Sequence, residues 1–138
     1  MKMRVRSKFL GIVILSVFIY GCSSIDLSTP EKNVDTLYYA ISKKDAGLYA
    51  KCFYEKGEFT TSEIKQAAPH IFARLKILRY KIIQRENIGP NEVKLKIEEF
   101  SQRENGVKCS STFMIRFIKI GKQWKILDSK TIEFKKIE

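Results

Sequence analysis

The side chains that could carry covalent or metal chemistry are few in this chain of 138 residues. It contains three cysteines, Cys22, Cys52 and Cys109, and a single histidine, His70. None of the cysteines belongs to a C-x-x-C pair, so the spacing does not indicate a redox motif. A zinc site needs about four Cys, His or carboxylate ligands, and one histidine with scattered cysteines does not form that pattern. We therefore expect no metal site and no cofactor.

Cys22 stands at the end of a distinctive amino-terminal segment. A head of four cations without an acid precedes the apolar run Phe9–Tyr20, and polar Ser23-Ser24 follow the cysteine. The run is too short for a membrane span, which needs about 20 apolar residues. A basic head, a short apolar run and a small residue before the break are typical of a secretory signal peptide, predicted here over residues 1–21.

The sequence Ile19-Tyr20-Gly21-Cys22 resembles the lipobox of bacterial lipoproteins, with Tyr20 departing from the usual small residue. The resemblance implies that the Cys22 thiol receives diacylglycerol and that the chain is cut before it. Acyl chains would then attach the protein to a membrane, each buried CH₂ contributing about 0.8 kcal/mol. We expect residues 22–29 to form a lipidated tether in the cell envelope. Ser23 implies the periplasmic face of the outer membrane if the host has two membranes.

The charge balance limits the partners. The whole chain carries +11, and without the four cations of the signal peptide 22 basic residues face 15 acidic ones, a net charge of +7. The basic residues alternate with acids such as Glu98, Glu99 and Glu104 instead of forming a block, which argues against nucleic acid as a partner. A solvated lysine-rich surface and attraction to anionic lipid headgroups both remain open.

Cys52 and Cys109 form an even pair in a chain expected to be exported, where disulfides persist. A bridge between them would close a loop of more than about 50 residues and contribute about 4 kcal/mol in the chain-entropy model. The alternative is two buried thiols that pack as small apolar groups. The sequence leaves both interpretations open.

Capping signals and helical spacing predict three helices after the tether, over about residues 30–44, 45–56 and 61–75. Thr29-Pro30-Glu31 and Asp45 can begin the first two, and Thr60 to Glu63 has the pattern of a capping box. Pro69 lies inside the third segment, where we expect it to kink the helix or to break it after Ala68.

From about residue 77 the apolar residues recur at every second position, which predicts four strands. Asn105-Gly106 is a strong hairpin signal. Strands joined by turns this short cannot be parallel. The predicted fold class is therefore α+β, with three amino-terminal helices packed on a curved four-stranded antiparallel sheet.

Three local patterns resemble the NTF2-like (cystatin-like cone) superfamily. They are the helix start at Pro30-Glu31, the link Lys43-Lys44-Asp45, and the hairpin with Gly121, Trp124 and Ile126. The resemblance covers about residues 30–136, and it implies an NTF2-like domain over residues 30–138. The superfamily contains isomerases, dehydratases, oligomerisation modules and domains without known activity, so the resemblance implies a fold more than a function.

Enzymatic members of that superfamily place an Asp or His deep in the cone as a base. Asp45 is explained by capping, and His70 lies beside the apolar stripe of its helix. Asp128 has the parity of Trp124 along the strand and could therefore point inward. No catalytic constellation is present, and we expect no catalytic residues and no enzyme.

The sequence favours a lipid-anchored binding protein. Its ligand would be a small apolar molecule in a cone lined by Phe113, Trp124, Ile126 and Asp128, or an envelope protein would dock on the open sheet face. That face could also form a homodimer. An open cavity of several hundred Å³ would favour the ligand, and a filled one the sheet face. The alternative is an isomerase or dehydratase with a buried Asp128 or His70 as base.

Overall fold

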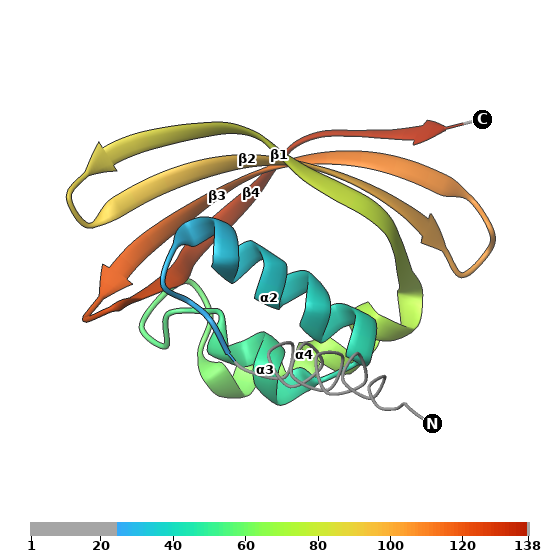
Figure 1. The fold of residues 1–138 in the computed structure, drawn as a ribbon. Coiled ribbons are helices and arrows are strands. Elements are labelled where there is room, and N and C mark those ends of the chain that lie inside the picture. Colours follow the sequence, from blue (N-terminus) through green and yellow to red (C-terminus); the bar gives the residue numbers. More distant parts are fainter. Residues whose placement is uncertain (1–24, 138) are drawn as a thin grey trace, which may run out of the picture.

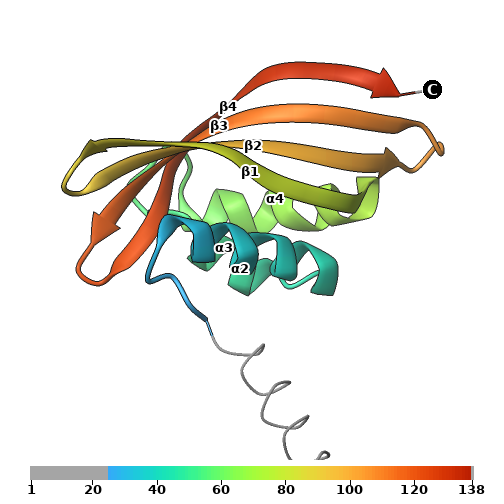
Figure 2. The ribbon, with the colours of Figure 1, turned by 45° about the horizontal axis from the view of Figure 1, so that its top comes forward.

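The computed structural model describes residues 25–137, which form three helices followed by four strands. The helices and strands are α2 (Pro30–Lys43), α3 (Ala46–Lys51), α4 (Thr61–Arg74), β1 (Leu75–Gly89), β2 (Glu92–Arg103), β3 (Lys108–Ile120) and β4 (Gln123–Ile137). The strands form one antiparallel sheet in the order β1-β2-β3-β4. Figures 1 and 2 show all three helices on one face of this sheet, which confirms the predicted α+β architecture.

The predicted signal peptide, Cys22 and the first residues of the tether lie outside the described residues. Within residues 25–137, no helix is long and apolar enough to cross a membrane. The lipid attachment at Cys22 therefore stays a prediction from the sequence.

The helices begin where their capping signals stand. The Thr29 side chain accepts a hydrogen bond from Lys32 N, and the Asp45 side chain accepts one from Leu48 N. Thr60 and Glu63 form a complete capping box at the start of α4. Each cap gives a partner to an amide that the first helical turn leaves free. Asp45 is therefore a structural cap, as predicted.

Pro69 does not break α4, contrary to one of the two outcomes we expected. The helix runs without interruption from Thr61 to Arg74, with Pro69 exposed inside it. A proline in a helix removes one backbone hydrogen bond and crowds the preceding turn. Buried contacts of Ile64, Ala68 and Phe72 on the opposite stripe hold both halves of the helix to the domain.

The sheet is strongly curved, and its register explains how. The β1–β2 pairing shifts at three places, and the β3–β4 pairing shifts between Thr112 and Phe113 and between Arg116 and Phe117. Each such bulge places an extra residue on one strand and bends it. The curvature shown in Figure 2 wraps the sheet around the helices and creates a concave inner face.

The two faces of the sheet differ in burial. On β2, residues at odd positions from Val93 to Ser101 are buried, and the even positions between them are only partly buried. We call the face that carries these odd-numbered β2 residues and their register partners on the other strands the inner face. The opposite face, which carries the even-numbered β2 residues and their partners, is the outer face. The main apolar core packs between the inner face and the helices, chiefly around Leu37, Tyr38, Leu95, Ile97 and Phe117.

Asn33 ties the helices to the sheet at the narrow end of the core. Its side-chain Nδ2 donates to the carbonyl of Cys52 at 2.9 Å and to that of Trp124 at 2.8 Å. The residue is fully buried, and its Oδ1 has no hydrogen-bond partner. A single amide therefore joins α2, the end of α3 and β4.

Cys52 and Cys109 do not form the disulfide that we considered. Both are buried free thiols. Cys52 lies beside Ile126, whose amide donates to the Cys52 carbonyl, and Ile126 pairs with Phe117 on β3. Cys109 lies eight residues farther along β3, about 26 Å at 3.3 Å per residue. A bridge needs Cα atoms within about 7 Å, so the alternative of two packed thiols is the correct one.

Candidate ligand-binding site

A cavity of about 280 Å³ lies between the helices and the inner face of the sheet. Side chains from α2, α4 and all four strands line it, together with Tyr49 of α3 and Phe53 just after it. Most are apolar or aromatic, and the polar groups are the Tyr38 and Tyr49 hydroxyls, Glu99 and Ser129. Apolar walls with a few placed polar groups are typical of small-molecule sites.

Glu99 is the one carboxyl of the cavity wall. It lies on the inner face of β2, and only 7% of its surface is exposed. The Tyr38 hydroxyl donates to Glu99 Oε1 at 2.6 Å. Burial raises the pKa of the Glu99 carboxyl, while the Tyr38 hydrogen bond and the positive charge of Arg103 oppose that rise. Glu99 is therefore a buried carboxyl that holds a proton more tightly than an ordinary glutamate.

Tyr38 is held in place from two strands. Its ring stacks on that of Tyr80 of β1, with ring centroids 4.0 Å apart and 13° between the planes. The Tyr80 hydroxyl donates in turn to Asp35 Oδ1 at 2.8 Å. Burial raises the pKa of the Tyr38 hydroxyl far above its ordinary value, with a smaller effect from the Glu99 charge. Tyr38 is thus a neutral donor, fixed in direction, that holds α2 against the centre of the sheet.

Glu99 was not identified as a site residue from the sequence, although a signal was present. Val93, Leu95 and Ile97 already marked the buried parity of β2, and Glu99 continues it. We had grouped Glu99 with the acids that alternate with lysines. The better interpretation is that a charged residue on a buried parity is itself a candidate functional residue.

Of the four residues predicted to line the cavity, Phe113 and Ile126 do so. Trp124 does not. It lies in the core with 9% of its surface exposed, and its amide donates to the carbonyl of Leu27 at 2.7 Å. The indole therefore packs in the apolar core and does not line the cavity.

Asp128 does not point inward, because parity changes between it and Trp124. The register shift beside Arg116 and Phe117 leaves Leu127 as an extra residue on β4. Asp128 consequently pairs with Arg116 on the outer face and accepts hydrogen bonds from its guanidinium, which also bonds Glu92. His70 is exposed on α4. Neither residue is available as a buried base.

The described residues contain no group of three or more His, Cys, Asp or Glu side chains arranged to hold a metal ion. What the cavity offers is an apolar volume, a fixed tyrosine hydroxyl and a carboxyl that can accept or donate a hydrogen bond according to its protonation. This arrangement can bind a small apolar molecule and can also exchange a proton with it.

Comparison with known proteins gives a likeness in fold alone. No protein-family model matches the chain, and no curated protein matches it. A SEC-C motif containing protein from Rhodopseudomonas palustris aligns with a TM-score of 0.64 at 13% identity, over 78% of this chain and 82% of that one. A ketosteroid isomerase-like protein from Erwinia carotovora aligns at 0.62 and 12%, over 81% and 96%.

An NTF-2 like protein of unknown function from Shewanella oneidensis aligns with a TM-score of 0.60 at 12% identity, over 72% of this chain and 93% of that one. At such identities the likeness concerns the backbone. One fold hosts many unrelated functions, so the function has to be argued from the site. Helices α2 to α4 and strands β1 to β4 of this chain form a domain with the NTF2-like cone fold.

Proposed function

We propose that the domain is a binding module that holds a small, largely apolar molecule between its helices and the inner face of the sheet. The observation that carries this proposal is the 280 Å³ cavity, which is lined by Phe113, Ile115 and Ile126 among others. An apolar molecule transferred there from water gains about 25 cal/mol for each Å² of surface that it buries. The Glu99–Tyr38 pair would orient one polar group of the ligand.

Titration of the full chain with 1-decanol, followed by calorimetry, tests this proposal. Ser129 is exposed, lines the cavity and pairs with Ile115 on the inner face, so Ser129→Trp should fill the cavity and abolish binding. Lys130→Trp is the matched control, because Lys130 pairs with Met114 on the outer face. Equal binding by both variants, or no binding by the unaltered chain, would contradict the proposal.

The buried Glu99 favours a second candidate, in which the cavity catalyses a proton transfer on its ligand. A carboxyl with a raised pKa in an apolar site is suited to general acid–base chemistry near neutral pH. The ionised fraction of Glu99 would remove a proton next to a carbonyl and return it from the protonated carboxyl. This resembles the isomerase or dehydratase alternative, with Glu99 in place of Asp128 or His70.

Deuterium exchange into 2-decanone separates the two candidates. If the domain only binds, exchange at the carbons beside the carbonyl in D₂O should proceed at the rate of a protein-free control. Exchange that the protein accelerates, and that Glu99→Gln abolishes while 1-decanol still binds, would establish the catalytic candidate. Glu98→Gln serves as the control, because Glu98 lies on the outer face, 3.7 Å from Lys81 Nζ.

We also propose that acyl chains on Cys22 attach the protein to the membrane of the cell envelope. The support is the sequence of residues 1–24, with its basic head, its apolar run and the cysteine that follows this run. Cys22→Ser should abolish labelling by palmitate and leave an uncleaved or mislocalised precursor. Cleavage and labelling equal to the parent chain would show that the assignment is wrong.

A further inference from the structure

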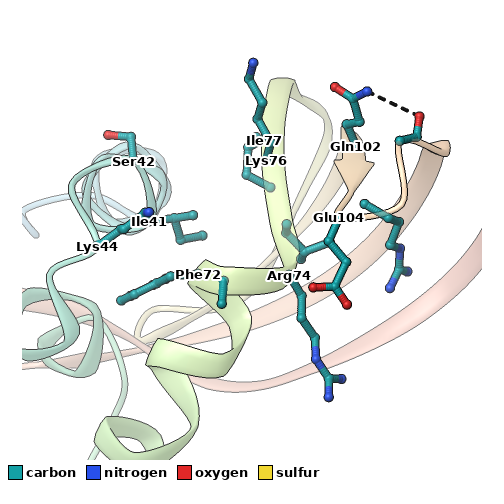
Figure 3. Close-up of a pocket in the computed structure, with 13 residues that line it drawn as sticks. Ile41, Ser42, Lys44, Phe72, Arg74, Lys76, Ile77, Gln102 and Glu104 are labelled. Carbon is teal, nitrogen blue, oxygen red and sulfur yellow. Dashed lines mark hydrogen bonds between the residues drawn. The ribbon is translucent and has the colours of Figure 1, made fainter.

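A second and larger hollow adjoins the cavity. A depression of about 630 Å³ lies between the carboxyl ends of α2 and α4 and the adjoining ends of β1 and β2. It shares Ile41, Leu75 and Ile77 with the cavity. Figure 3 shows Ile41 projecting from α2 toward the start of β1. We call this depression the mouth, because it adjoins the apolar cavity and carries charged side chains at the surface.

The mouth is strongly positive. Lys44, Arg74, Lys76 and Arg103 line it, and Glu104 is its one acid. Within residues 25–137, none of these four cations lies in an ion pair, whereas Lys81, Arg85 and Arg116 all do. Positions at the carboxyl ends of helices account for Lys44 and Arg74. They do not account for Arg103 on the inner face of β2, whereas Lys76 shares the outer face with its strand partner Gln102.

Arg103 lines the mouth, and its charge also acts on Glu99 in the cavity wall. It lies on the inner face of β2, as Glu99 does. Its guanidinium carbon lies 5.2 Å from the centre of the Phe134 ring of β4. A cation over an aromatic face is held by the charge distribution of the ring. Arg103 therefore places a positive charge at the boundary between the apolar interior and the opening.

Resting on the proposed function, we propose that the ligand is a single-chain anionic amphiphile. Its apolar chain occupies the cavity, and its anionic head group lies among the cations of the mouth. The apolar walls exclude a head group from the interior, because an unpaired charge loses its hydration there. Figure 3 shows the charged end of Arg74 on the side of α4, whereas Lys76 points the opposite way, on the outer face with its strand partner Gln102. The preference is therefore for negative charge in general, without a single fixed anion contact.

A series of ligands with matched chains tests this inference. The purified full chain is titrated at neutral pH with decanoate, 1-decanol and decylammonium. We expect decanoate to bind about tenfold more tightly than 1-decanol, because several exposed ion pairs each add a modest attraction. Decylammonium should bind most weakly of the three. Salt should weaken decanoate binding and leave 1-decanol binding unchanged.

Two substitutions locate the preference at the mouth. Arg103→Gln and Arg74→Gln should each weaken decanoate binding by roughly 2- to 5-fold and leave 1-decanol binding unaltered. Lys96→Gln removes the same charge from the outer face, where Lys96 pairs with Met114, and should have no such effect. Equal loss from all three variants would overturn the inference, because only the overall charge would then matter.

The outcomes separate this inference from the proposed function. If decanoate and 1-decanol bind equally and Ser129→Trp abolishes both, the cavity binds apolar molecules without a charge preference. That result overturns the anionic head group and leaves the proposed function intact. Tighter binding of decylammonium would also overturn it. If none of the three molecules binds, both the inference and the proposed function are wrong.

Discussion

Glu98 and Glu99 are neighbours on β2, yet they lie in opposite environments. Glu98 is on the outer face, where its carboxylate is 3.7 Å from Lys81 Nζ. Glu99 is on the inner face, buried and hydrogen-bonded to Tyr38. The outer face carries further ion pairs, among them the cluster of Arg116 with Glu92 and Asp128. Successive residues of a strand point to opposite faces of the sheet. The Glu98 side chain therefore faces solvent, and the Glu99 side chain faces the core.

This contrast shows which charged residues of the domain carry information about function. Charges on the outer face are solvated and screened, and pairs of this kind contribute about 0–1 kcal/mol to stability. Burial of the Glu99 carboxyl instead costs free energy, because the group loses its hydration. An apolar residue at the same position would not have this cost. Because Glu99 lines the cavity, it places a polar group where a ligand would contact it. Matched substitutions on the two faces test this contrast.

The largest difference between the faces should come from packing. Trp124→Ala removes a large side chain from the core at the closed end of the cone and should lower the free energy of unfolding by about 3–5 kcal/mol. Met114→Ala on the half-buried outer face should lower it by at most about 1 kcal/mol. Denaturant unfolding measures both values. An unchanged stability of the Trp124 variant would show that the indole is exposed and that the hairpin is misplaced.

The second prediction concerns the attachment of the helices to the inner face. Asn33→Ala leaves the carbonyls of Cys52 and Trp124 without their side-chain donor inside the core. The Cys52 carbonyl still accepts from Ile126 N, so the expected loss is about 1–3 kcal/mol, chiefly the cost of leaving the Trp124 carbonyl without its side-chain donor. Lys32→Ala, one residue earlier on the exposed side of α2, is the control. If both variants have the melting temperature of the parent chain, Asn33 does not hold the helices to the sheet.

The third prediction uses the two glutamates directly. Because the pKa of Glu99 lies above its ordinary value in the folded chain, the folded state binds this proton more tightly than the unfolded state. The stability that this proton contributes falls as the pH rises from about 4.5 through the folded pKa. Glu99→Gln does not titrate, and its Oε1 can still accept from Tyr38.

The stability of Glu99→Gln relative to the parent chain should therefore increase as the pH rises over that range. Glu98→Gln should change stability by less than about 0.5 kcal/mol. Thermal melts of the three chains between pH 4 and 8 provide the comparison. Parallel profiles for Glu99→Gln and the parent chain would mean that folding does not raise the pKa of Glu99.

The smallest effect concerns the two thiols. With Cys22→Ser to remove the third cysteine, the unfolded, non-reduced chain should react with two maleimide groups. A reducing agent should leave its thermal stability unchanged, because Cys52 and Cys109 are both free. Labelling that appears only after reduction would restore the disulfide, and with it about 4 kcal/mol of loop-closure stabilisation.

Local chemistry made most of the fold predictable. The caps at Thr29, Asp45 and Thr60 marked the helix starts, and the alternation of apolar residues marked the four strands and their inner face. These signals depend on neighbouring residues, so a single sequence contains them.

The site was less predictable, because it depends on register and on contacts between distant segments. The extra residue Leu127 reverses the parity of β4, so Asp128 lies outside although it shares its parity with Trp124. Phe113 and Ile126 could be placed by alternation, whereas the distance from Cys52 to Cys109 depends on how α3 aligns along the sheet. Glu99 continues the buried alternation of β2, so the sequence pattern alone already indicated it as a candidate site residue.

Nuclear Overhauser contacts in the complex of the full chain with 1-decanol show whether the ligand lies between the helices and the inner face. A ligand bound there should show contacts from its decyl chain to the methyl groups of Ile77, Ile115 and Ile126, which line the cavity. It should show none to Met114 or Ile118, which alternate with Ile115 and Phe117 on the outer face. Contacts to the outer pair, or to neither set, would contradict that location.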